Sequence, residues 1–441
     1  MGLADYIKKE LPNWPNWLNL CLLFFNRFGS LVYGRGFLRF SKDVEHFDEE
    51  KMLLKTINFA IKHVEYYRKR YSGVEIKTID DFKAKIGFID KNEVMEHWEE
   101  FLVDGIDMSK CNIGTTGGTS GKPLKLVIPK NRYITECYFV DKVRKRLGWN
   151  YDVRAVIRNH KLPDNKNYMV NPITKEFLFD AFRMDERYAC QVYRILKKYK
   201  VKYIHAYPSA VYQFLKLCNN QNLDLSILKG CFLGSEGLTE EQILFFKSIK
   251  VPICYTYGHS EKLIYAGNNG VDFDLFVEPK YGYCEIIDAK GNSITNGFGE
   301  LVGSTYYNKY FYLIRYKTGD FADVDGYGFC GGEKMLKMKK VYGRRDKSVL
   351  YKADGTTTSL TALNVHGDFY EHINGMQYIQ EQVGYLKCLI IKNGLFSIED
   401  ERFIKDHLSI AMGGDNYICI EYVDKLIFQE NGKFLPLISK L

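Results

Sequence analysis

The sequence contains no close pairs of cysteines. Its eleven cysteines are scattered singly from Cys21 to Cys419, with no Cys-x-x-Cys pair, and we expect no signal peptide at the N-terminus. This usage is typical of a reducing cytoplasm, which is where we expect the protein. Cys231, Cys254 and His259 could in principle meet around a metal, but zinc sites normally contain closely spaced ligand pairs. Their absence favours buried free thiols.

The sequence also has no apolar run long enough to cross a membrane. The most apolar stretch near its start, residues 18–33, is interrupted by Asn19, Asn26 and Arg27, well short of a membrane span. We expect a packed helix there. An interfacial helix is the alternative, so any contact with a membrane would be peripheral.

Low-complexity linkers and internal repeats are missing, and only 10 of the 441 residues are proline. Hydrophobic residues make up 46% of the chain and charged residues 26%, a composition that can bury a large core and argues against long disorder. Because the chain exceeds the usual size of one core, we expect two or more packed units.

The net charge is +8, from 62 basic and 54 acidic residues, with basic runs at residues 197–202 and 334–345. Such runs are usually solvated faces. They could also attract an anionic ligand such as a nucleotide, coenzyme A or a sugar phosphate, or else nucleic acid or anionic lipid. No recognised nucleic-acid module supports the nucleic-acid option, so we expect no nucleic-acid partner.

Hydrophobic periodicity divides the chain into parts. Helical spacing dominates residues 1–100. Short β-branched runs then alternate with helical stretches, which is typical of an α/β domain with parallel strands. The expected strands are 124–128, 154–157, 203–206, 230–233 and 253–256, and the expected helices are 186–199 and 240–249.

Closely spaced strands at residues 281–324, with turn signals at 288–291 and 295–297, indicate a β-rich subdomain. A further α/β pattern follows, with strands at 386–391 and 417–422 around a helix at 399–411. We therefore predict an α/β fold with a large domain and a small C-terminal one. The predicted parts are a helical region 1–100, a core 101–344 and a C-terminal domain 345–441.

Residues 116–123 read Thr-Gly-Gly-Thr-Ser-Gly-Lys-Pro and lead into an expected strand. Glycines let the backbone approach phosphates closely, and the amides and hydroxyls can donate to phosphate oxygens. This favours a polyphosphate site, while a polar hairpin turn would explain the glycines but not the hydroxyls. A P-loop NTPase is disfavoured, because Thr116 replaces its first glycine and Pro123 its magnesium-binding hydroxyl.

A second glycine-rich segment, residues 326–331, fits the Gly-x-Gly-x-x-Gly pattern of dinucleotide-binding units. It follows Asp323-Val324-Asp325, which we interpret as a hairpin-like turn, and no convincing apolar helix follows it. We therefore predict a turn at residues 326–331.

The segment at residues 116–123 resembles the phosphate loop of the adenylate-forming superfamily, which contains acyl-CoA synthetases, luciferases and peptide-synthetase adenylation domains. Further motifs occur in the order of that family. They are Gly-Ser-Glu-Gly-Leu at 234–238, Tyr-Gly-His-Ser-Glu at 257–261 with Ser in place of Thr, Arg-Tyr-Lys-Thr-Gly-Asp at 315–320 with Lys in place of Arg, Gly-Arg-Arg-Asp at 343–346, and Asn-Gly-Lys at 431–433.

The short C-terminal domain, the helical N-terminus and Tyr-Pro-Ser at residues 207–209 are similar to one branch of that superfamily. This branch contains the phenylacetate-coenzyme A ligase-like proteins, including those from capsular-polysaccharide clusters. The resemblance implies a large adenylate-forming domain of several subdomains, followed by a small, mobile C-terminal lid.

The resemblance also implies a role for each matching residue. The residues that would hold the ATP phosphates are Thr116, Gly117, Gly118, Thr119, Ser120, Gly121 and Lys122. Those that would contact adenine and ribose are Gly234, Ser235, Glu236, Tyr257, Gly258, Asp320 and Arg344. Glu261 would bind Mg²⁺, a hard cation that suits a carboxylate. Lys433 would bridge the α-phosphate and the attacking carboxylate, stabilising charge that develops only in transfer, and Asp346 would be the pivot of the lid.

The acid pocket is less sharply defined by the resemblance. Relatives build it from the stretch that holds Tyr138, Arg158, His160, Arg183, His205 and Tyr207, and His259 is a further candidate. Arg183 or His160 could meet a second carboxylate, although surface roles are an equal alternative.

The implied activity is that of an AMP-forming ligase with ATP and Mg²⁺ as cofactors. It would activate a small carboxylic acid as an acyl-adenylate and pass the acyl group to coenzyme A, or to an amine or hydroxyl of a sugar. Two alternatives stay open at this point: a non-catalytic nucleotide-binding protein on the same fold, and a membrane or nucleic-acid binder that uses the basic runs.

Overall fold

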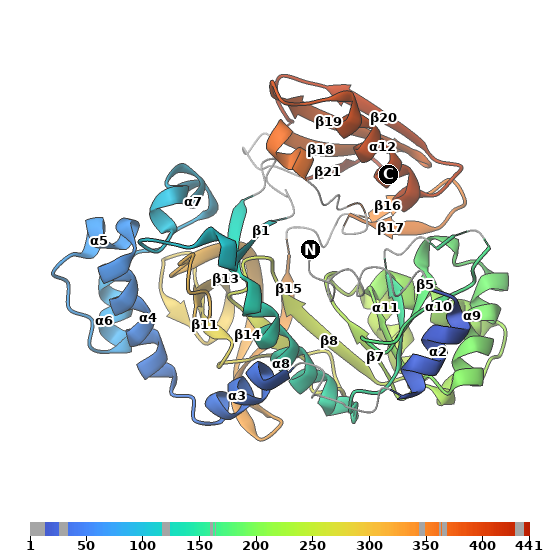
Figure 1. Cartoon of the computed structure of the whole chain (residues 1–441), viewed down its shortest axis with the longest axis horizontal. Coiled ribbons are helices and arrows are strands. Elements are labelled where there is room, and N and C mark those ends of the chain that lie inside the picture. The colour runs from blue at the N-terminus through green and yellow to red at the C-terminus, as the bar shows by residue number, and fades with distance from the viewer. Residues whose placement is uncertain are drawn as a thin grey trace.

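The computed structural model describes residues 14–25, 34–116, 124–158, 162–163, 165–343, 349–360, 363, 368–427 and 436–441. It consists of a large body built around one long sheet and a smaller C-terminal domain that lies against the body (Figure 1). This arrangement confirms the expected α/β fold with a separate small C-terminal domain.

The first part of the body is helical, as predicted. Its helices are α2 (Asn16–Phe25), α3 (Gly34–Glu45), α4 (Glu49–His63), α5 (Glu65–Tyr71), α6 (Ile79–Lys85) and α7 (Lys91–Glu96). Three of them begin at side chains that accept a hydrogen bond from the backbone amide three residues on, namely Asp48, Thr78 and Asp90. Such caps satisfy amides that lack a partner in the first helical turn.

Helix α2 packs on the body. Its Leu23 is buried, and Asn16 Nδ2 donates a hydrogen bond of 2.9 Å to the carbonyl of Tyr168. Trp17 on the same helix is 68% exposed. Among the described residues, no helix has both the length and the apolar character needed to cross a membrane.

The body contains a thirteen-stranded sheet in the order β12-β11-β13-β14-β15-β10-β9-β8-β7-β6-β3-β5-β4. From β8 to β5 the neighbouring strands are parallel, and from β9 to β12 they are antiparallel. The parallel strands are β3 (Arg154–Arg158), β5 (Glu176–Asp180), β6 (Tyr203–Ala206), β7 (Gly230–Leu233) and β8 (Ile253–Gly258), with β4 (Met169–Asn171) antiparallel at the edge.

The antiparallel half corresponds to the predicted β-rich subdomain. Its strands are β9 (Tyr265–Gly267), β10 (Leu275–Val277), β11 (Gly282–Ile287), β12 (Ser293–Ile294), β13 (Asn296–Thr305), β14 (Tyr316–Cys330) and β15 (Glu333–Tyr342). The turn predicted at residues 288–291 is present, because the amide of Gly291 donates to the carbonyl of Asp288 between β11 and β12.

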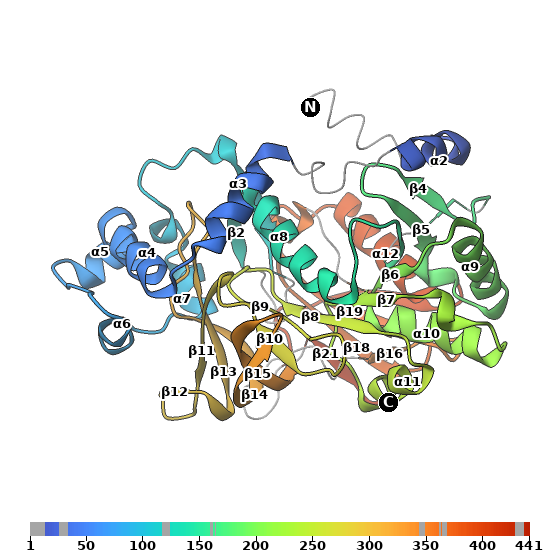
Figure 2. The same cartoon turned by 90° about the horizontal axis from the view of Figure 1, so that it is seen from below.

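Helices cover both faces of the parallel half. One face packs on α9 (Glu186–Tyr199), α10 (Pro208–Asn220) and α11 (Glu240–Ile249) through residues such as Ile204 and Leu233, and the other packs on α8 (Tyr133–Arg144) through residues such as Phe232. Figure 2 shows α8 on one side of β7 and β8 and α10 and α11 on the other. Because side chains alternate along a strand, adjacent residues pack against the helices on opposite faces of the sheet.

The prediction of a turn at residues 326–331 was wrong for most of this glycine-rich segment. Residues 323–325, expected to form a turn, lie within β14, and so do residues 326–330. The strand continues through a register shift between Val324 and Tyr327, and the chain reverses at Gly331 and Gly332, which both have positive φ. The alternation of apolar and polar side chains that indicates a strand is hard to see here, because the segment contains glycines at residues 326, 328 and 331. The segment is a long β-hairpin and opens no helix of a dinucleotide-binding unit.

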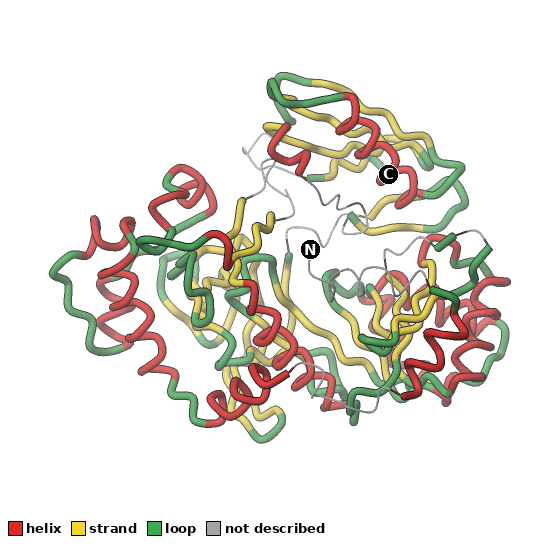
Figure 3. Tube along the Cα trace, in the orientation of Figure 1, coloured by secondary structure: helices red, strands yellow, loops and turns green. Residues whose placement is uncertain are grey.

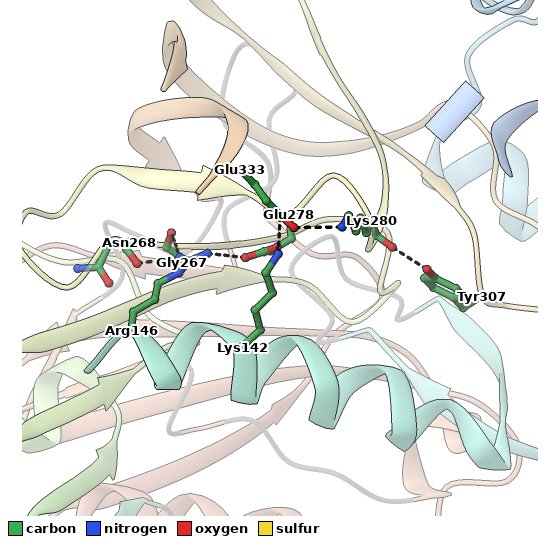
Figure 4. A network of polar contacts seen from close by, with 8 residues as sticks. All are labelled: Lys142, Arg146, Gly267, Asn268, Glu278, Lys280, Tyr307 and Glu333. Carbon is green, nitrogen blue, oxygen red and sulfur yellow. Dashed lines mark hydrogen bonds and ion pairs between the residues drawn. The ribbon is translucent and has the colours of Figure 1, made fainter. Parts of the chain in front are cut away.

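A buried ionic network fixes α8 to the sheet (Figure 4). Glu278 is fully buried and pairs with both Lys142 of α8 and Arg146 in the 3-10 turn that follows this helix. Lys142 also reaches Glu333 at 2.6 Å, and Lys280 approaches the same carboxylate at 3.0 Å. Arg146 donates further to the carbonyls of Gly267 and Asn268. A buried carboxylate requires such partners to offset the loss of hydration.

The C-terminal domain has its own sheet and core. Strands β18 (Ile373–Gln382), β19 (Tyr385–Lys392), β20 (Tyr417–Tyr422) and β21 (Leu437–Ser439) form the order β20-β19-β18-β21. Helix α12 (Ile398–Met412) covers this sheet and begins with a capping box between Ser397 and Asp400. Figure 3 shows the domain above the parallel half of the body, where Phe182 packs against its core.

Candidate functional site

The predicted phosphate loop projects from a two-stranded hairpin. Strands β1 (Cys111–Thr115) and β2 (Lys125–Pro129) pair antiparallel. Thr116 and Leu124 close the base of the loop, because the Thr116 amide donates to the Leu124 carbonyl and the Leu124 amide donates to Thr116 Oγ1, both at 2.9 Å. Gly117, Gly118, Thr119, Ser120, Gly121 and Lys122 lie outside the described residues.

Two predicted nucleotide-binding segments follow adjacent parallel strands. Gly234 comes directly after β7, and Tyr257 and Gly258 end β8. In open α/β sheets, ligands bind beyond the carboxyl ends of the strands. A Cβ at Gly234 would stand 2.7 Å from Thr256 Oγ1, so glycine is required for the close approach of these two strand ends.

Glu236, in the loop after β7, serves the N-terminus of α10. Its carboxylate accepts from the amide of Ser209 at 3.0 Å and from the Ser209 hydroxyl at 3.1 Å. The first amides of a helix lack intrahelical partners and carry partial positive charge, so a carboxylate there is stabilised. The backbone of Ser235 has a positive φ of 72°, which turns the loop at this point.

Tyr257 and Asp320 are in direct contact. The Tyr257 hydroxyl donates to Asp320 Oδ2 at 2.9 Å, and the amide of Asp320 donates to Thr318 Oγ1. Burial and the neighbouring Asp320 charge raise the pKa of Tyr257 well above its usual value. The phenol therefore stays protonated and continues to donate, which fixes the orientation of the carboxylate on β14.

Glu261 is held by two side chains. Its Oε2 lies 3.0 Å from His259 Nδ1, and its Oε1 accepts from the Tyr316 hydroxyl at 3.2 Å. The amide of Ile264 donates to His259 Nε2, which places the proton of a neutral imidazole on Nδ1, facing Glu261. Both ring nitrogens of His259 thus have protein partners. It positions Glu261 in this structure, whereas the sequence suggested it for the acid pocket.

A second layer supports the Glu261 segment from α8. Arg132 Nε donates to Glu136 Oε1 at 3.0 Å and Arg132 Nη2 donates to the carbonyl of Lys262, while Lys262 Nζ reaches Glu136 Oε2 at 3.1 Å. Burial opposes the ionisation of Glu136, but Arg132 and Lys262 outweigh it and lower the pKa of this carboxyl. A small pocket adjoins this cluster and is lined by Leu126, Ile128, Arg132, Glu261, Lys262, Leu263, Asn308, Phe311 and Leu313. Strand β2, which carries the predicted phosphate loop, therefore lies beside Glu261.

Three acid-pocket candidates come together at the carboxyl ends of β3 and β6. Arg158 Nη1 lies 3.4 Å from His205 Nε2, and the Arg158 guanidinium carbon lies 4.5 Å from the centroid of the Tyr207 ring. The Arg158 Nη2 also donates to Ser235 Oγ at 3.4 Å. This cluster therefore adjoins the loop after β7.

The remaining acid-pocket candidates lie elsewhere or outside the described residues. Arg183 pairs with Asp180 at 3.3 Å and donates to the carbonyl of Lys166 at 2.7 Å, and Tyr138 packs edge-on against Phe40 within the α8 layer. His160 falls outside the described part of the chain. The same is true of Arg344, Asp346 and Lys433, so their roles stay predictions.

The metal alternative considered for the thiols has no support in the described part of the chain, where no group of three or more His, Cys, Asp or Glu residues could hold an ion. All eleven cysteines are free. Burial raises the pKa of Cys254 to about 12, so this thiol is protonated at neutral pH. The expectation of free thiols, most of them at least partly buried, is confirmed.

The structure resembles known ligases over most of its length. One similar structure is 2-hydroxyisobutyryl-CoA ligase in complex with 2-HIB-AMP and CoA in the thioesterification state. The match has a TM-score of 0.56 and 12% identity, and it covers 88% of this chain and 89% of that ligase. An open conformation of that ligase with 2-HIB-AMP and CoA gives a TM-score of 0.52, 13% identity and coverage of 88% and 90%. The search of curated proteins gave no match.

This similarity shows that the chain has the fold of the adenylate-forming ligases. Within the C-terminal domain, residues 350–440 match the CapK C-terminal domain family. Together the two findings confirm the resemblance to the CapK-like branch of the adenylate-forming superfamily.

Several supporting residues were not found from the sequence. Tyr316 lies inside a recognised motif, so its contact with Glu261 could have been suspected from its position. Ser209, which binds Glu236, and Glu136, which joins Arg132 to Lys262, carry no local signal, because the contacts span 27 and 126 positions of sequence respectively.

Proposed function

We propose that this protein activates a carboxylic acid with ATP, forming an acyl-adenylate and pyrophosphate, and then transfers the acyl group to an acceptor. The observation that carries the proposal is the meeting of the Tyr257–Asp320 pair, Glu261 and the β1–β2 hairpin on a body with the adenylate-forming fold.

ATP would lie across the carboxyl ends of β7 and β8. Residues 116–122 would surround the β- and γ-phosphates, and the loop at residues 234–236 would border adenine with Tyr257 and Gly258. Asp320 would accept hydrogen bonds from the ribose hydroxyls, and Tyr257, which donates to Asp320 at 2.9 Å, would hold that carboxylate in place. Arg344 would reach the same sugar.

Glu261 fits the role of a magnesium ligand. It is an oxygen donor that His259 and Tyr316 orient, and it adjoins the strand that carries the phosphate loop. Mg²⁺ usually keeps several waters and is held by one or two carboxylates together with substrate phosphates. When bound, it would neutralise charge on the phosphates. The chain would supply one carboxylate ligand, and the ATP phosphates and water would supply the other oxygen ligands.

The acid would bind beside the nucleotide, near the cluster of Arg158, His205 and Tyr207. The proximity of Ser235 to Arg158 places this cluster next to the loop assigned to adenine. Lys433 on the C-terminal domain would bridge the α-phosphate and the attacking carboxylate. This domain would turn about Asp346 between the two half-reactions.

The acceptor would be coenzyme A, or an amine or hydroxyl of a sugar in the assembly of a surface polysaccharide. A sugar acceptor is favoured by the match of residues 350–440 to the CapK C-terminal domain family, and coenzyme A by the fold shared with 2-hydroxyisobutyryl-CoA ligase. Incubation of a preformed acyl-adenylate with each acceptor, followed by mass spectrometry of the product, distinguishes these options.

The spent nucleotide tests the proposal. The protein is incubated with Mg-ATP and a panel of amino acids, aryl acids and short hydroxy and dicarboxylic acids, and the nucleotides are separated by chromatography. AMP with pyrophosphate is expected, because the carboxylate attacks the α-phosphate and expels pyrophosphate, and AMP leaves when the acyl group is transferred. ADP as the main product would overturn the adenylation mechanism. ATP binding without turnover of any acid would favour the non-catalytic alternative, and salt-sensitive binding to vesicles or nucleic acid without ATP binding would favour the basic-surface alternative.

A further inference from the structure

Arg158 is the last residue of β3, at the carboxyl edge of the parallel sheet. Ile157 pairs in register with Ala206 of β6, and Val156 pairs with His205. Because side chains alternate along a strand, Arg158 projects to the same face as Val156 and His205, opposite the face where Ile157 and Ala206 join the core under α10. Its side chain therefore lies on the face of the sheet opposite α10, and it is only partly buried.

The charge of Arg158 is not compensated within the described part of the chain, where its polar contacts are the two 3.4 Å contacts with His205 Nε2 and Ser235 Oγ. Other arginines of the same body have carboxylate partners. Arg154, four residues earlier on β3, pairs with Glu176, and Arg183 pairs with Asp180. Arg158 is a guanidinium that neutral groups hold loosely.

Two carboxylates on segments beside Arg158, those of Asp180 and Glu236, accept hydrogen bonds from other donors. Asp180 stands opposite Arg158 in the β3–β5 ladder, but its carboxylate accepts from the amides of Leu162 and Phe182 at 3.0 Å and 2.9 Å. Glu236 accepts from the backbone and the hydroxyl of Ser209. Neither carboxylate forms an ion pair with Arg158 in the described structure.

The guanidinium plane is nevertheless held in place. The Tyr207 ring lies 4.5 Å from its central carbon, a distance at which cation and ring attract. His205 offers Nε2 as an acceptor on one side and Ser235 offers its hydroxyl on another. A planar cation with five donors in a fixed fork, held by a ring and two weak neutral contacts, is suited to a bidentate oxyanion.

We propose that Arg158 binds a second carboxylate of the acid substrate, so that the protein acts on dicarboxylic acids. This inference rests on the proposed function. One carboxylate of the substrate would react with ATP, and the other would form a bidentate pair with Arg158. Partial burial strengthens this pair relative to water, and a monoacid of the same size would leave the guanidinium without a partner. Arg158 would then determine specificity without taking part in bond making.

The test compares diacids with their own half-amides, which keep the shape and the reacting carboxylate but lose the second charge. Succinate, glutarate, adipate and phthalate, each with its monoamide, are measured by calorimetric binding and by ATP–pyrophosphate exchange. The wild-type protein is expected to bind at least one diacid ~10- to 100-fold more tightly than its half-amide, as for a charged hydrogen-bonded pair. Arg158→Gln should abolish this preference and leave Mg-ATP affinity unchanged, and Arg158→Lys should retain part of it.

Arg194→Gln is the matched control, because it removes the same charge from an exposed position on α9 in the same half of the body. It should preserve the preference for the diacid. Near-ultraviolet circular dichroism of each variant checks that the fold is intact. If Arg158→Gln does not fold, Arg158→Lys tests the inference instead, because its preference for the diacid over the half-amide should be weaker than that of the wild type.

The outcomes separate this inference from the proposed function. Arg158-dependent binding of a diacid without pyrophosphate exchange would support the inference and overturn adenylation. Exchange with monoacids that does not depend on Arg158 would support adenylation and overturn the inference. Failure of every diacid to bind, or a loss of Mg-ATP affinity in Arg158→Gln as large as the loss for the diacid, would also overturn it.

Discussion

The Tyr257 hydroxyl donates a hydrogen bond of 2.9 Å to Asp320 Oδ2, and this contact joins the end of β8 to β14 across the middle of the long sheet. The two residues are 63 positions apart in the sequence. The contact links the parallel half of the sheet with the antiparallel half at the predicted ribose site. Because Tyr257 remains protonated, it continues to donate to Asp320 and orients the carboxylate.

Replacement of Asp320 by alanine should weaken the binding of Mg-ATP by roughly 1.5 to 3 kcal/mol, because a ribose hydroxyl would lose a charged acceptor. Tyr257→Phe should have a smaller effect, since it removes the group that orients Asp320 but not the acceptor itself. Isothermal calorimetry with Mg-ATP measures both. Asp323→Ala, on the same strand, is the control and should bind as the wild type does. Equal affinities of Asp320→Ala and wild type would remove Asp320 from the nucleotide site.

The network at α8 predicts a large loss of stability when one cation is removed. In Arg146→Met, the fully buried Glu278 would keep Lys142 but lose its other partner. Leaving a buried charge poorly compensated costs about 3 to 5 kcal/mol, which urea unfolding would report as a lower free energy of unfolding. The double variant Arg146→Met, Glu278→Leu should recover part of this loss, because it removes the buried carboxylate as well. A double variant less stable than the single one would contradict this account.

Asp141 predicts a pH dependence of stability. Its side chain is 2% exposed, and burial raises its pKa from 3.8 to about 6 although Arg144 opposes the shift. Between these two values the folded state binds more protons than the unfolded chain, so this group destabilises the fold progressively as the pH rises from 4 to above 6. The loss amounts to roughly 3 kcal/mol, since one pKa unit corresponds to about 1.4 kcal/mol.

Asp141→Asn removes this dependence. Between pH 4 and pH 8, the difference in free energy of unfolding between the variant and the wild type should shift by roughly 2.5 kcal/mol in favour of the variant. Comparison of the two proteins across pH cancels constant effects, such as the changed contact with Arg144. Parallel urea titrations at four pH values measure the shift. A difference that does not change with pH would show that Asp141 is charged throughout.

Much of the fold could be predicted from the sequence because its elements have strong local signals. Helix α9 and strands β6, β7 and β20 match the predicted bounds at both ends, since regular periodicity and flanking polar residues mark them. Strand β14 was cut short in the prediction, because the glycines at residues 326, 328 and 331 mimic a turn. Residues 327–330 of this segment are extended because they pair with β15.

Site residues that belong to short motifs could be predicted from the sequence. Site residues whose role depends on tertiary contacts could not. Asp320, Tyr257 and Glu261 stand in motifs that can be recognised in sequence. The sequence did not show that Arg158 and Arg183 have different partners, because only the folded chain determines which guanidinium lies beside a carboxylate. Arg183 has Asp180, and Arg158 has neutral neighbours.

The last prediction concerns Lys433, whose motif places it on the C-terminal domain beyond the proposed pivot at Asp346. From there it can reach the α-phosphate in one orientation of the domain and must leave when the domain turns for acyl transfer. If it stabilises charge only in the adenylation transition state, Lys433→Ala should lower the rate of adenylation at least ~10²-fold while barely changing ATP affinity.

Transfer from a synthetic acyl-adenylate should survive in Lys433→Ala, because that half-reaction uses the other orientation of the domain. Single-turnover pyrophosphate release measures the first step, and product formation from the supplied adenylate measures the second. Lys425→Ala, another lysine of the same domain, is the control for a general loss of positive charge. Equal loss of both half-reactions in Lys433→Ala would refute this division of labour, and an unchanged rate of adenylation would make Lys433 an ordinary solvated lysine.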